Sequence, residues 1–320
     1  MRPTALSLLL CLAACSSLSS DEYSRLASHQ RNAKYYFDGA HYEQALDQIE
    51  RGLEIDADDY VLNSMRGAIL LMRSGDASGT DHTDLDAATK VLTRIYETRS
   101  PNRHEPHLLV NYGLALEKQG RRHLAVALRL EQDVARKGGD PGASAAEREQ
   151  ARSNLLEART AFGVLVDRGE QLRIAHYHRL LIAETLQDEA AFGAEAKAYF
   201  EVASRDQETV RKEIERTTVA NYEAAKLQQL RMLHAEELEV RSLVAGREFA
   251  AKRYDEALVH LNRVLELDPQ RSADYYNRGR VLLSIGRTVE AKDDFRKFLA
   301  TTTLPSGSEK KAFAQEALAR

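Results

Sequence analysis

Apolar residues recur at helical spacing along most of the chain, and short polar stretches separate the helical runs. In residues 253–269, RYDEALVHLNRVLELDP, the apolar side chains form one stripe that stops at Asp268-Pro269. Proline lacks the amide hydrogen that would continue a helix, so the helix is predicted to end there. A second pair of helices is predicted in residues 273–299, ADYYNRGRVLLSIGRTVEAKDDFRKFL. The pattern therefore predicts helical hairpins rather than strands.

This pattern repeats at a fixed interval of 34 residues, which separates the members of three apolar pairs: Ala257 and Ala291, Leu261 and Phe295, Val264 and Phe298. The small residues Gly279 and Ala291 allow two helices to approach closely, and Gly286 suits a tight turn. The interval and these residues resemble the tetratricopeptide repeat, in which each unit is a pair of antiparallel helices. The resemblance implies an α-solenoid whose first helices line a concave face that binds a peptide or a partner helix.

The same signature is present nearer the start of the chain. HYEQALDQIERGLEID (residues 41–56) matches the second helix of a unit, and a further unit begins at Asp59 or Tyr60. Asp56, Asp58 and Asp59 are predicted to cap its first helix, because carboxylates favour a helix N-terminus. Its second helix is predicted in residues 85–101, after a polar loop in residues 74–84. A third unit is predicted from His107, with KGGDPG (residues 137–142) interrupting the array after it; its packing residues would be Gly113, Leu116, Gly120, Ala125 and Leu128.

The middle of the chain is less regular. Residues 175–203 match the repeat, but Glu195 stands where a small residue is usual. Residues 206–243 contain neither glycine nor proline, which predicts one or more long helices. Near the end of the chain, Ser308 is predicted to cap a short helix that covers the last repeat.

The amino-acid composition also favours an all-α fold. The chain is rich in alanine, leucine, glutamate and arginine, and it has only 17 glycines and 6 prolines in 320 residues, which favours helix over sheet. The predicted fold class is all-α, a tetratricopeptide-like α-solenoid of helix-turn-helix repeats with a long-helix middle region. Five segments are expected: a signal peptide (1–14), a lipidated cysteine with its tether (15–24), an N-terminal repeat array (25–140), an irregular helical region with a degenerate repeat (141–240), and C-terminal repeats with a capping helix (241–320).

The first residues predict a membrane anchor. Arg2 precedes an apolar run from Ala5 to Ala14 that is too short to span a bilayer. The run ends in Leu12-Ala13-Ala14-Cys15, which resembles a bacterial lipobox, and the resemblance implies that the Cys15 thiol is acylated and the chain cut before it. Two alternatives are cleavage without lipidation and a chance apolar start on a cytoplasmic adaptor. Because Ser16 follows the cysteine, in place of the acidic residue that retains lipoproteins in the enterobacterial inner membrane, we expect the periplasmic face of the outer membrane.

The charge balance bears on the partners. Basic side chains number 45 and acidic ones 49, for a formal net charge of −4. Such a mixed, mildly acidic surface argues against nucleic acid as the main partner. Membrane contact is expected only through lipid on Cys15.

No motif of an enzyme is present: the chain has no phosphate-binding glycine loop, nucleophile elbow or His-Glu-x-x-His. Ser308 and Lys311 form an isolated Ser-x-x-Lys pair, which fits a capping serine better. The pairs His104 and His107, and His176 and His178, favour surface or groove positions over a metal site. We therefore expect no catalytic residue, no cofactor and no metal. The acidic loop (Asp76, Asp81, His82, Asp84 and Asp86) is expected to be a solvated insertion, and the alternative is that it binds a cation weakly.

Candidate partner-binding residues come from the first helix of each unit. A cation beside an aromatic ring can hold both a carboxylate and an apolar side chain of a peptide. The residues predicted to line the groove are Lys34, Phe37, Asn111, Tyr276 and Arg280. No two-carboxylate clamp of the kind that binds chaperone C-termini is visible.

Together these features predict a non-catalytic, lipid-anchored scaffold that binds envelope proteins through its concave face. LLVNYGLALEKQGR (residues 108–121) is similar to pilotin-type factors, which help a pilus or secretion machine to assemble. One alternative is an adaptor for peptidoglycan remodelling that binds glycan or a hydrolase. A rival of another class is an enzyme or carbohydrate-binding protein with its site in residues 143–240.

Overall fold

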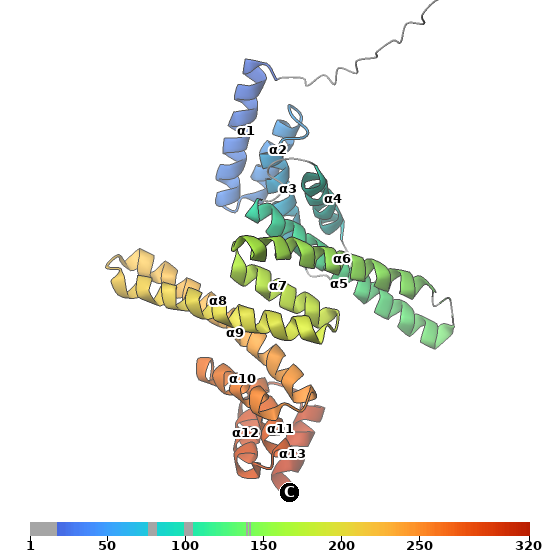
Figure 1. Ribbon diagram of the computed structural model, residues 1–320, viewed down its shortest axis with the longest axis vertical. Helices are drawn as coiled ribbons and strands as arrows, with labels where there is room; N and C mark the ends of the chain where they lie inside the picture. Colours follow the sequence, from blue (N-terminus) through green and yellow to red (C-terminus); the bar gives the residue numbers. More distant parts are fainter. Residues whose placement is uncertain (1–17, 76–81, 99–104, 139, 141) are drawn as a thin grey trace, which may run out of the picture. The chain divides into compact units, whose positions relative to one another are not determined.

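The computed structural model describes residues 18–75, 82–98, 105–138, 140 and 142–320 (Figure 1). These residues form α-helices and no strand, which confirms the all-α prediction. The helices are α1 (Ser20–Asp38), α2 (Tyr42–Leu53), α3 (Tyr60–Arg73), α4 (Thr83–Glu97), α5 (Pro106–Lys137), α6 (Gly142–Arg168), α7 (Leu172–Thr185), α8 (Glu189–Arg216), α9 (Ala220–Ala250), α10 (Tyr254–Leu267), α11 (Ser272–Ser284), α12 (Thr288–Thr301) and α13 (Glu309–Ala319). Consecutive helices pack as antiparallel pairs, so the fold is a tetratricopeptide-like α-solenoid.

The chain divides into two compact units, and the boundary falls inside α6, between Val164 and Leu165. The N-terminal unit contains α1 to α5 and most of α6. The C-terminal unit contains α7 to α13. Each unit has its own buried core of aliphatic and aromatic side chains.

Five turns in the described part of the chain share one geometry: those of α1–α2, α6–α7, α7–α8, α9–α10 and α11–α12. Their left-handed residues are Ala40, Gly169, Gln187, Lys252 and Gly286. In each turn the amide of the left-handed residue donates to the carbonyl three residues earlier, and the next amide donates five residues back, as in Gly286 to Leu283 and Arg287 to Leu282. The backbone hydrogen bonds therefore hold the turn even where a residue other than glycine occupies the left-handed position.

In two of the pairs, a glycine on the first helix leaves room for a large side chain on the second. A Cβ atom added at Gly279 would lie 2.8 Å from the Phe295 ring, and one added at Gly67 would lie 2.6 Å from Leu92. Phe295 and Leu92 are fully buried. This contact sets the register of α11 on α12 and of α3 on α4.

The pair α7–α8 meets the same requirement with the sizes exchanged. Counting from the shared turn, Leu180 stands at the place of Gly279, and Ala196 at that of Phe295. Both belong to the buried core of this pair. Glu195 stands where the repeat usually has a small residue, and its side chain has polar partners. His176 Nδ1 lies 2.7 Å from one carboxylate oxygen, and Arg179 Nε donates to the other at 2.7 Å. The buried carboxylate is thus fully bonded.

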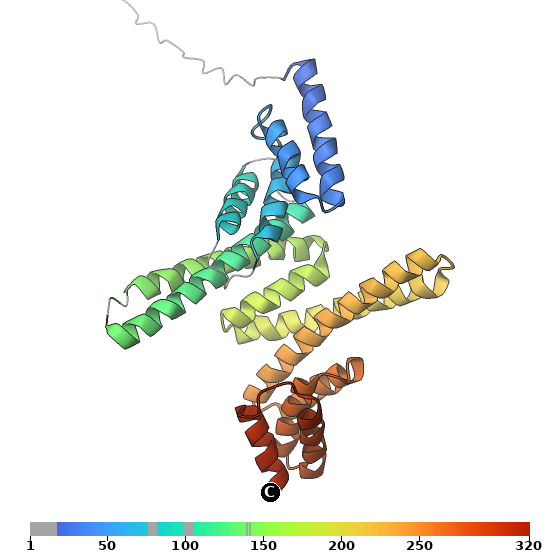
Figure 2. The same cartoon turned by 180° about the vertical axis from the view of Figure 1, so that it is seen from behind.

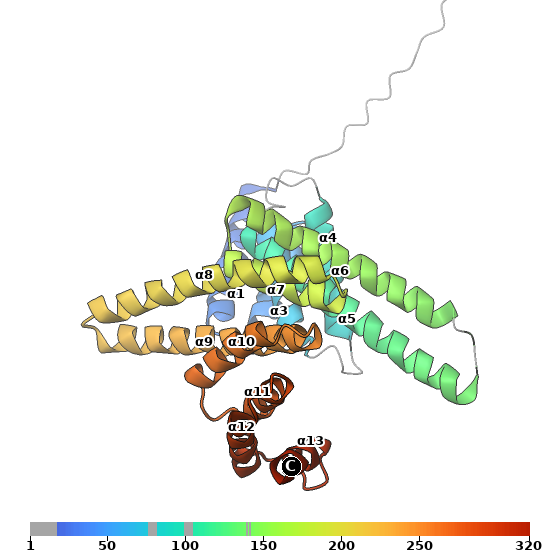
Figure 3. The same cartoon turned by 60° about the horizontal axis from the view of Figure 1, so that its bottom comes forward.

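The third repeat predicted from His107 is wrong as a helix-turn-helix unit. Residues 106–137 form the single helix α5, which runs through Gly120 without a turn. Figure 3 shows α6 running antiparallel beside it. A Cβ at Gly113 would lie 2.7 Å from the Phe162 ring of α6, and one at Gly120 the same distance from Leu155. Both glycines therefore serve close helix packing, and the array continues into α6.

The long helices predicted for the middle of the chain are confirmed, with one break at residues 217–219. The second half of α8 and the first half of α9 lie side by side and extend away from the rest of the C-terminal unit (Figure 2). At the base of this extension Glu237 is buried, and it accepts hydrogen bonds from Gln207 and Arg241, each at 2.6 Å.

The last helix, α13, covers the final repeat as predicted. Phe313 packs against the rings of Tyr276 and Phe295, each with centroids 5.9 Å away. Ser308 occupies the N-cap position, but its side chain makes no capping hydrogen bond. Within the part of the chain that the structure describes, no helix is long and apolar enough to cross a bilayer.

Candidate functional site

Two of the predicted groove residues lie at the end of α1. Lys34 is exposed and pairs with Asp38, with Nζ 2.9 Å from the carboxylate. Phe37 is half-buried and packs against Tyr42 in the N-terminal core. The charge of Lys34 is therefore already matched within α1, and Phe37 offers only part of its ring to a partner.

Two further predicted residues lie elsewhere. Asn111 lies in the first half of α5 and is half-buried. Cys15, the predicted site of lipid attachment, lies outside the described residues.

The remaining pair, Tyr276 and Arg280, lies on α11. Tyr276 is buried among the aromatic rings of α12 and α13, and its ring face is approached by the Arg280 guanidinium at 5.9 Å. The same guanidinium lies 4.7 Å from the centroid of Phe249 on α9. Arg280 is therefore held between two aromatic rings that come from successive first helices of the array.

Arg280 lines a groove of about 170 Å³ between α9 and α11, which we call the α9–α11 groove. Its walls are Ser242, Ala245, Gly246, Phe249, Leu261, Asn277, Arg280 and Val281. A Cβ added at Gly246 would meet no other atom within 4 Å, so this wall is open. The groove combines an apolar surface with one cation and one amide.

The electrostatics of the groove favour an anionic or carbonyl-bearing occupant. Arg280 makes no ion pair with a described residue, and the nearby carboxylate of Asp274 is engaged, because it accepts from Arg271 Nε at 2.7 Å and from Ser242 Oγ at 3.1 Å. The amide of Asn277 can donate to and accept from the backbone of an extended peptide. A guanidinium held on aromatic faces can take a carboxylate in a fork of two hydrogen bonds.

Phe249, Gly246 and Asn277 line the groove but are not among the residues predicted from the sequence. Asn277 and Arg280 are three residues apart on one helix, so a signal for Asn277 was available in the helical spacing. Phe249 lies near the end of the long α9, and only the packing of α9 against α11 brings it to Arg280.

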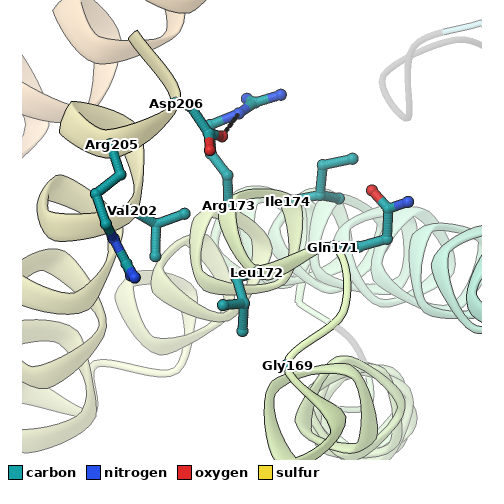
Figure 4. A pocket seen from close by; sticks show the side chains of 8 residues that line it. All are labelled: Gly169, Gln171, Leu172, Arg173, Ile174, Val202, Arg205 and Asp206. Atoms are coloured by element: carbon teal, nitrogen blue, oxygen red, sulfur yellow. Dashed lines mark ion pairs between the residues drawn. The ribbon is translucent and has the colours of Figure 1, made fainter. Parts of the chain in front are cut away.

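A larger cavity, of about 390 Å³, lies between the start of α7 and the middle of α8. Figure 4 shows Arg173 and Asp206 joined by an ion pair at this cavity, and the distance between them is 3.3 Å. Arg173 also pairs with Glu236. The charge of Arg173 is therefore balanced within the protein, whereas Arg205 at the same cavity makes no ion pair with a described residue. No aromatic ring lines the described part of this cavity to hold that cation, so it makes a weaker case for a ligand than the α9–α11 groove.

Among the described residues, no group of three or more histidine, cysteine, aspartate or glutamate side chains is placed to hold a metal ion. His176, one of the histidines considered from the sequence, pairs with Glu195 instead.

The acidic loop between α3 and α4 is described only at its ends. Asp76 and Asp81 lie outside the described residues. Asp84 pairs with Arg73 at 3.1 Å, and Asp86 accepts a hydrogen bond from Gln119 at 2.7 Å and pairs with Arg122. Burial would raise the pKa of Asp86, but these bonds from Gln119 and Arg122 outweigh it and hold the pKa below its ordinary value. Of the three aspartates predicted to cap α3, Asp59 does so, because its Oδ1 accepts from the Leu62 amide at 2.8 Å. Asp56 instead accepts from the Asp58 amide, and Asp58 pairs with Arg94.

Comparison with known proteins finds similarity only among solved structures. The sequence matches no protein-family model, and no curated protein matches it. Among solved structures, a tetratricopeptide repeat protein from Parabacteroides merdae is similar at 14% identity and a TM-score of 0.36, covering 92% of this chain and 98% of that one. The TPR2AB domain of yeast Sti1, in a complex with pHSP90, is similar at 11% identity and a TM-score of 0.28, covering 93% and 98%. Yeast Tom70 is similar at 12% identity and a TM-score of 0.18, covering 93% and 96%.

Proposed function

We propose that this protein is a non-catalytic scaffold that binds a segment of a partner protein in the α9–α11 groove. The observation that carries the proposal is Arg280, a cation without a described carboxylate partner that is held between Phe249 and Tyr276 on the wall of an open groove. A peptide that places a carboxylate on Arg280 and an apolar side chain beside Phe249 would satisfy both surfaces.

We also propose that the protein is anchored to the outer membrane. The lipobox-like sequence that ends at Cys15 supports attachment to the outer membrane by lipid, with the repeats in the periplasm. Several acyl chains, at about 0.8 kcal/mol for each buried methylene, give stable anchoring. In that setting the bound partner would be a component of an envelope machine of the pilus or secretion type, and the scaffold would assist its assembly.

The groove is tested by crosslinking in intact cells, followed by purification of the protein and identification of what comes with it. Gly246→Phe fills the open wall, and Arg280→Ala removes the cation. Arg296→Ala is the matched control, because Arg296 is an exposed residue of α12 that pairs with Asp293 and lies outside the groove lining. We expect a partner that is recovered with the wild type and the control and is lost with both groove variants. Retention of the same partner by both groove variants would refute the proposed site.

The anchor is tested separately by detergent phase partitioning of Cys15→Ala. We expect the wild type in the detergent phase with the outer membrane, and the variant in the aqueous phase. Equal partitioning of the two proteins would contradict the lipid anchor and would leave the groove proposal intact.

A further inference from the structure

Two grooves occupy equivalent positions in the two units. In the N-terminal unit the groove lies between the end of α2, α3 and α4; in the C-terminal unit it lies between α10, α11 and α12. The contacts of Gly67 with Leu92 and of Gly279 with Phe295 align the two helix pairs. Residues at matching positions can therefore be compared directly, and we call the two sites the α3–α4 groove and the α11–α12 groove.

The α11–α12 groove is electrically balanced. Its three cations are Arg278, Arg287 and Lys297, and its three acids are Glu290, Asp293 and Asp294. Arg278 donates from Nε and Nη2 to the two oxygens of Asp294, at 2.7 and 2.8 Å. The pair α7–α8 repeats this contact with Arg179 and Glu195.

The α3–α4 groove keeps two of the three cations and loses the acids. Arg66 stands at the position of Arg278, and Arg94 at that of Lys297. The three acidic positions are taken by Ala87, Lys90 and Val91, and none of the described residues that line the groove is acidic. Arg94 pairs with the exposed Asp58 outside the lining, whereas Arg66 and Lys90 make no ion pair with a described residue.

The two grooves also differ in volume and in their apolar lining. The α3–α4 groove encloses about 450 Å³, against about 250 Å³ in the α11–α12 groove. Leu53, Leu70 and Val91 contribute aliphatic side chains to its lining. Cations beside an apolar surface interact more strongly with an incoming anion than cations in open water.

We propose that the α3–α4 groove binds an acidic, leucine-containing helix of a partner protein. The C-terminal unit shows what satisfies such a groove: carboxylates presented by a helix at positions i, i+3 and i+4, as Glu290, Asp293 and Asp294 are. A partner helix with that spacing would bring the missing carboxylates to Arg66 and Lys90, and its leucines would cover Leu70 and Val91. This second binding site is independent of the α9–α11 groove.

The experiment measures the fluorescence anisotropy of labelled synthetic helical peptides that carry glutamate at i, i+3 and i+4 among leucines, with glutamine in place of glutamate as the reference peptide. Full-length wild type is compared with the double variant Lys90→Asp/Val91→Asp, which rebuilds two of the three acids of the α11–α12 groove and gives Arg66 a partner. Lys197→Asp, at an exposed position in α8, is the control for reversing one lysine charge elsewhere on the protein. Circular dichroism confirms that each variant is folded.

We expect the glutamate peptides to bind the wild type and Lys197→Asp, with affinity falling as salt rises, and to bind the double variant at least about tenfold more weakly. Arg280→Ala should bind these peptides as the wild type does, which separates this site from the proposed function. Equal binding of glutamate and glutamine peptides, or unchanged binding by the double variant, would overturn the proposal. So would groove-dependent binding of phosphatidylglycerol vesicles without binding of any glutamate peptide, because the anion recognised would then be a lipid headgroup.

Discussion

The exchange of sizes between Gly279–Phe295 and Leu180–Ala196 leads to a rescue experiment in the C-terminal unit. Gly279→Leu alone forces a side chain into the Phe295 ring, since even its Cβ would lie 2.8 Å away. Overpacking of this kind costs about 1–3 kcal/mol, offset by about 0.8 kcal/mol from replacing a glycine inside a helix. Phe295→Ala alone empties a fully buried site, which costs about 3–5 kcal/mol.

The double variant Gly279→Leu/Phe295→Ala recreates the pairing that α7–α8 already uses. If the two changes were independent, their costs would add to about 3–7 kcal/mol. Because the new leucine fills the space that the ring leaves, we expect a loss of only about 1–2 kcal/mol. The remainder reflects the ring contacts of Phe295 with Tyr276 and Phe313, which leucine does not restore.

Urea unfolding followed by far-ultraviolet circular dichroism measures the effect. With a slope of about 2 kcal/mol per molar urea, the midpoint of the C-terminal unit should lie about 1 M higher in the double variant than in Phe295→Ala. A double variant no more stable than Phe295→Ala would refute the reasoning. It would mean that the two helix pairs differ in the angle or distance between their helices, and not only in which helix carries the large side chain.

Three further predictions concern stability. Burial would raise the pKa of Glu195, but the hydrogen bond from His176 and the charge of Arg179 outweigh it and hold the pKa below its ordinary value of 4.5. The ionised carboxylate therefore stabilises the folded protein fully above that value, and this stabilisation is lost as the pH falls through the lower pKa of the folded state. Glu195→Gln should lower the free energy of unfolding by about 2 kcal/mol at neutral pH, and urea titrations at several pH values should show this loss shrinking on acidification. A constant deficit down to strong acid would contradict this assignment. Gly286→Ala, at φ 81°, should cost about 1 kcal/mol in thermal and urea unfolding, because a Cβ is strained in that conformation. Gln187→Gly, at φ 57°, should be neutral or stabilising in the same assays, and a loss like that of Gly286→Ala would show that the shared turn does not impose this strain.

The repeat pattern was enough to predict much of this architecture. Apolar stripes at a constant interval give helix pairs, and small residues opposite large ones give their packing, because both depend on neighbours close in sequence. The prediction failed at α5, where Gly113 and Gly120 have the spacing of a packing glycine and a turn glycine. In the structure both pack against α6, and the helix continues, since a glycine permits a turn without requiring one.

Of the candidate site, the sequence placed Arg280 beside Tyr276, because the two lie four residues apart on one helix. It did not place Phe249, which meets Arg280 only because α9 packs against α11. Nor did it show that Lys34 is paired within its own helix while Arg280 is not paired at all among the described residues. Whether a cation is satisfied depends on side chains from other helices.

By itself, the sequence of this protein determined which segments are helices, where most of them end, and that they pack in pairs, because propensity, turn residues and apolar spacing are local properties. Only the tertiary structure decided which charges remain unmatched. Arg66, Arg179 and Arg278 occupy the same position in their helices, yet Val91, Glu195 and Asp294 face them. The free energy of a buried or half-buried charge is set by what lies across from it, and that neighbour is supplied by the fold.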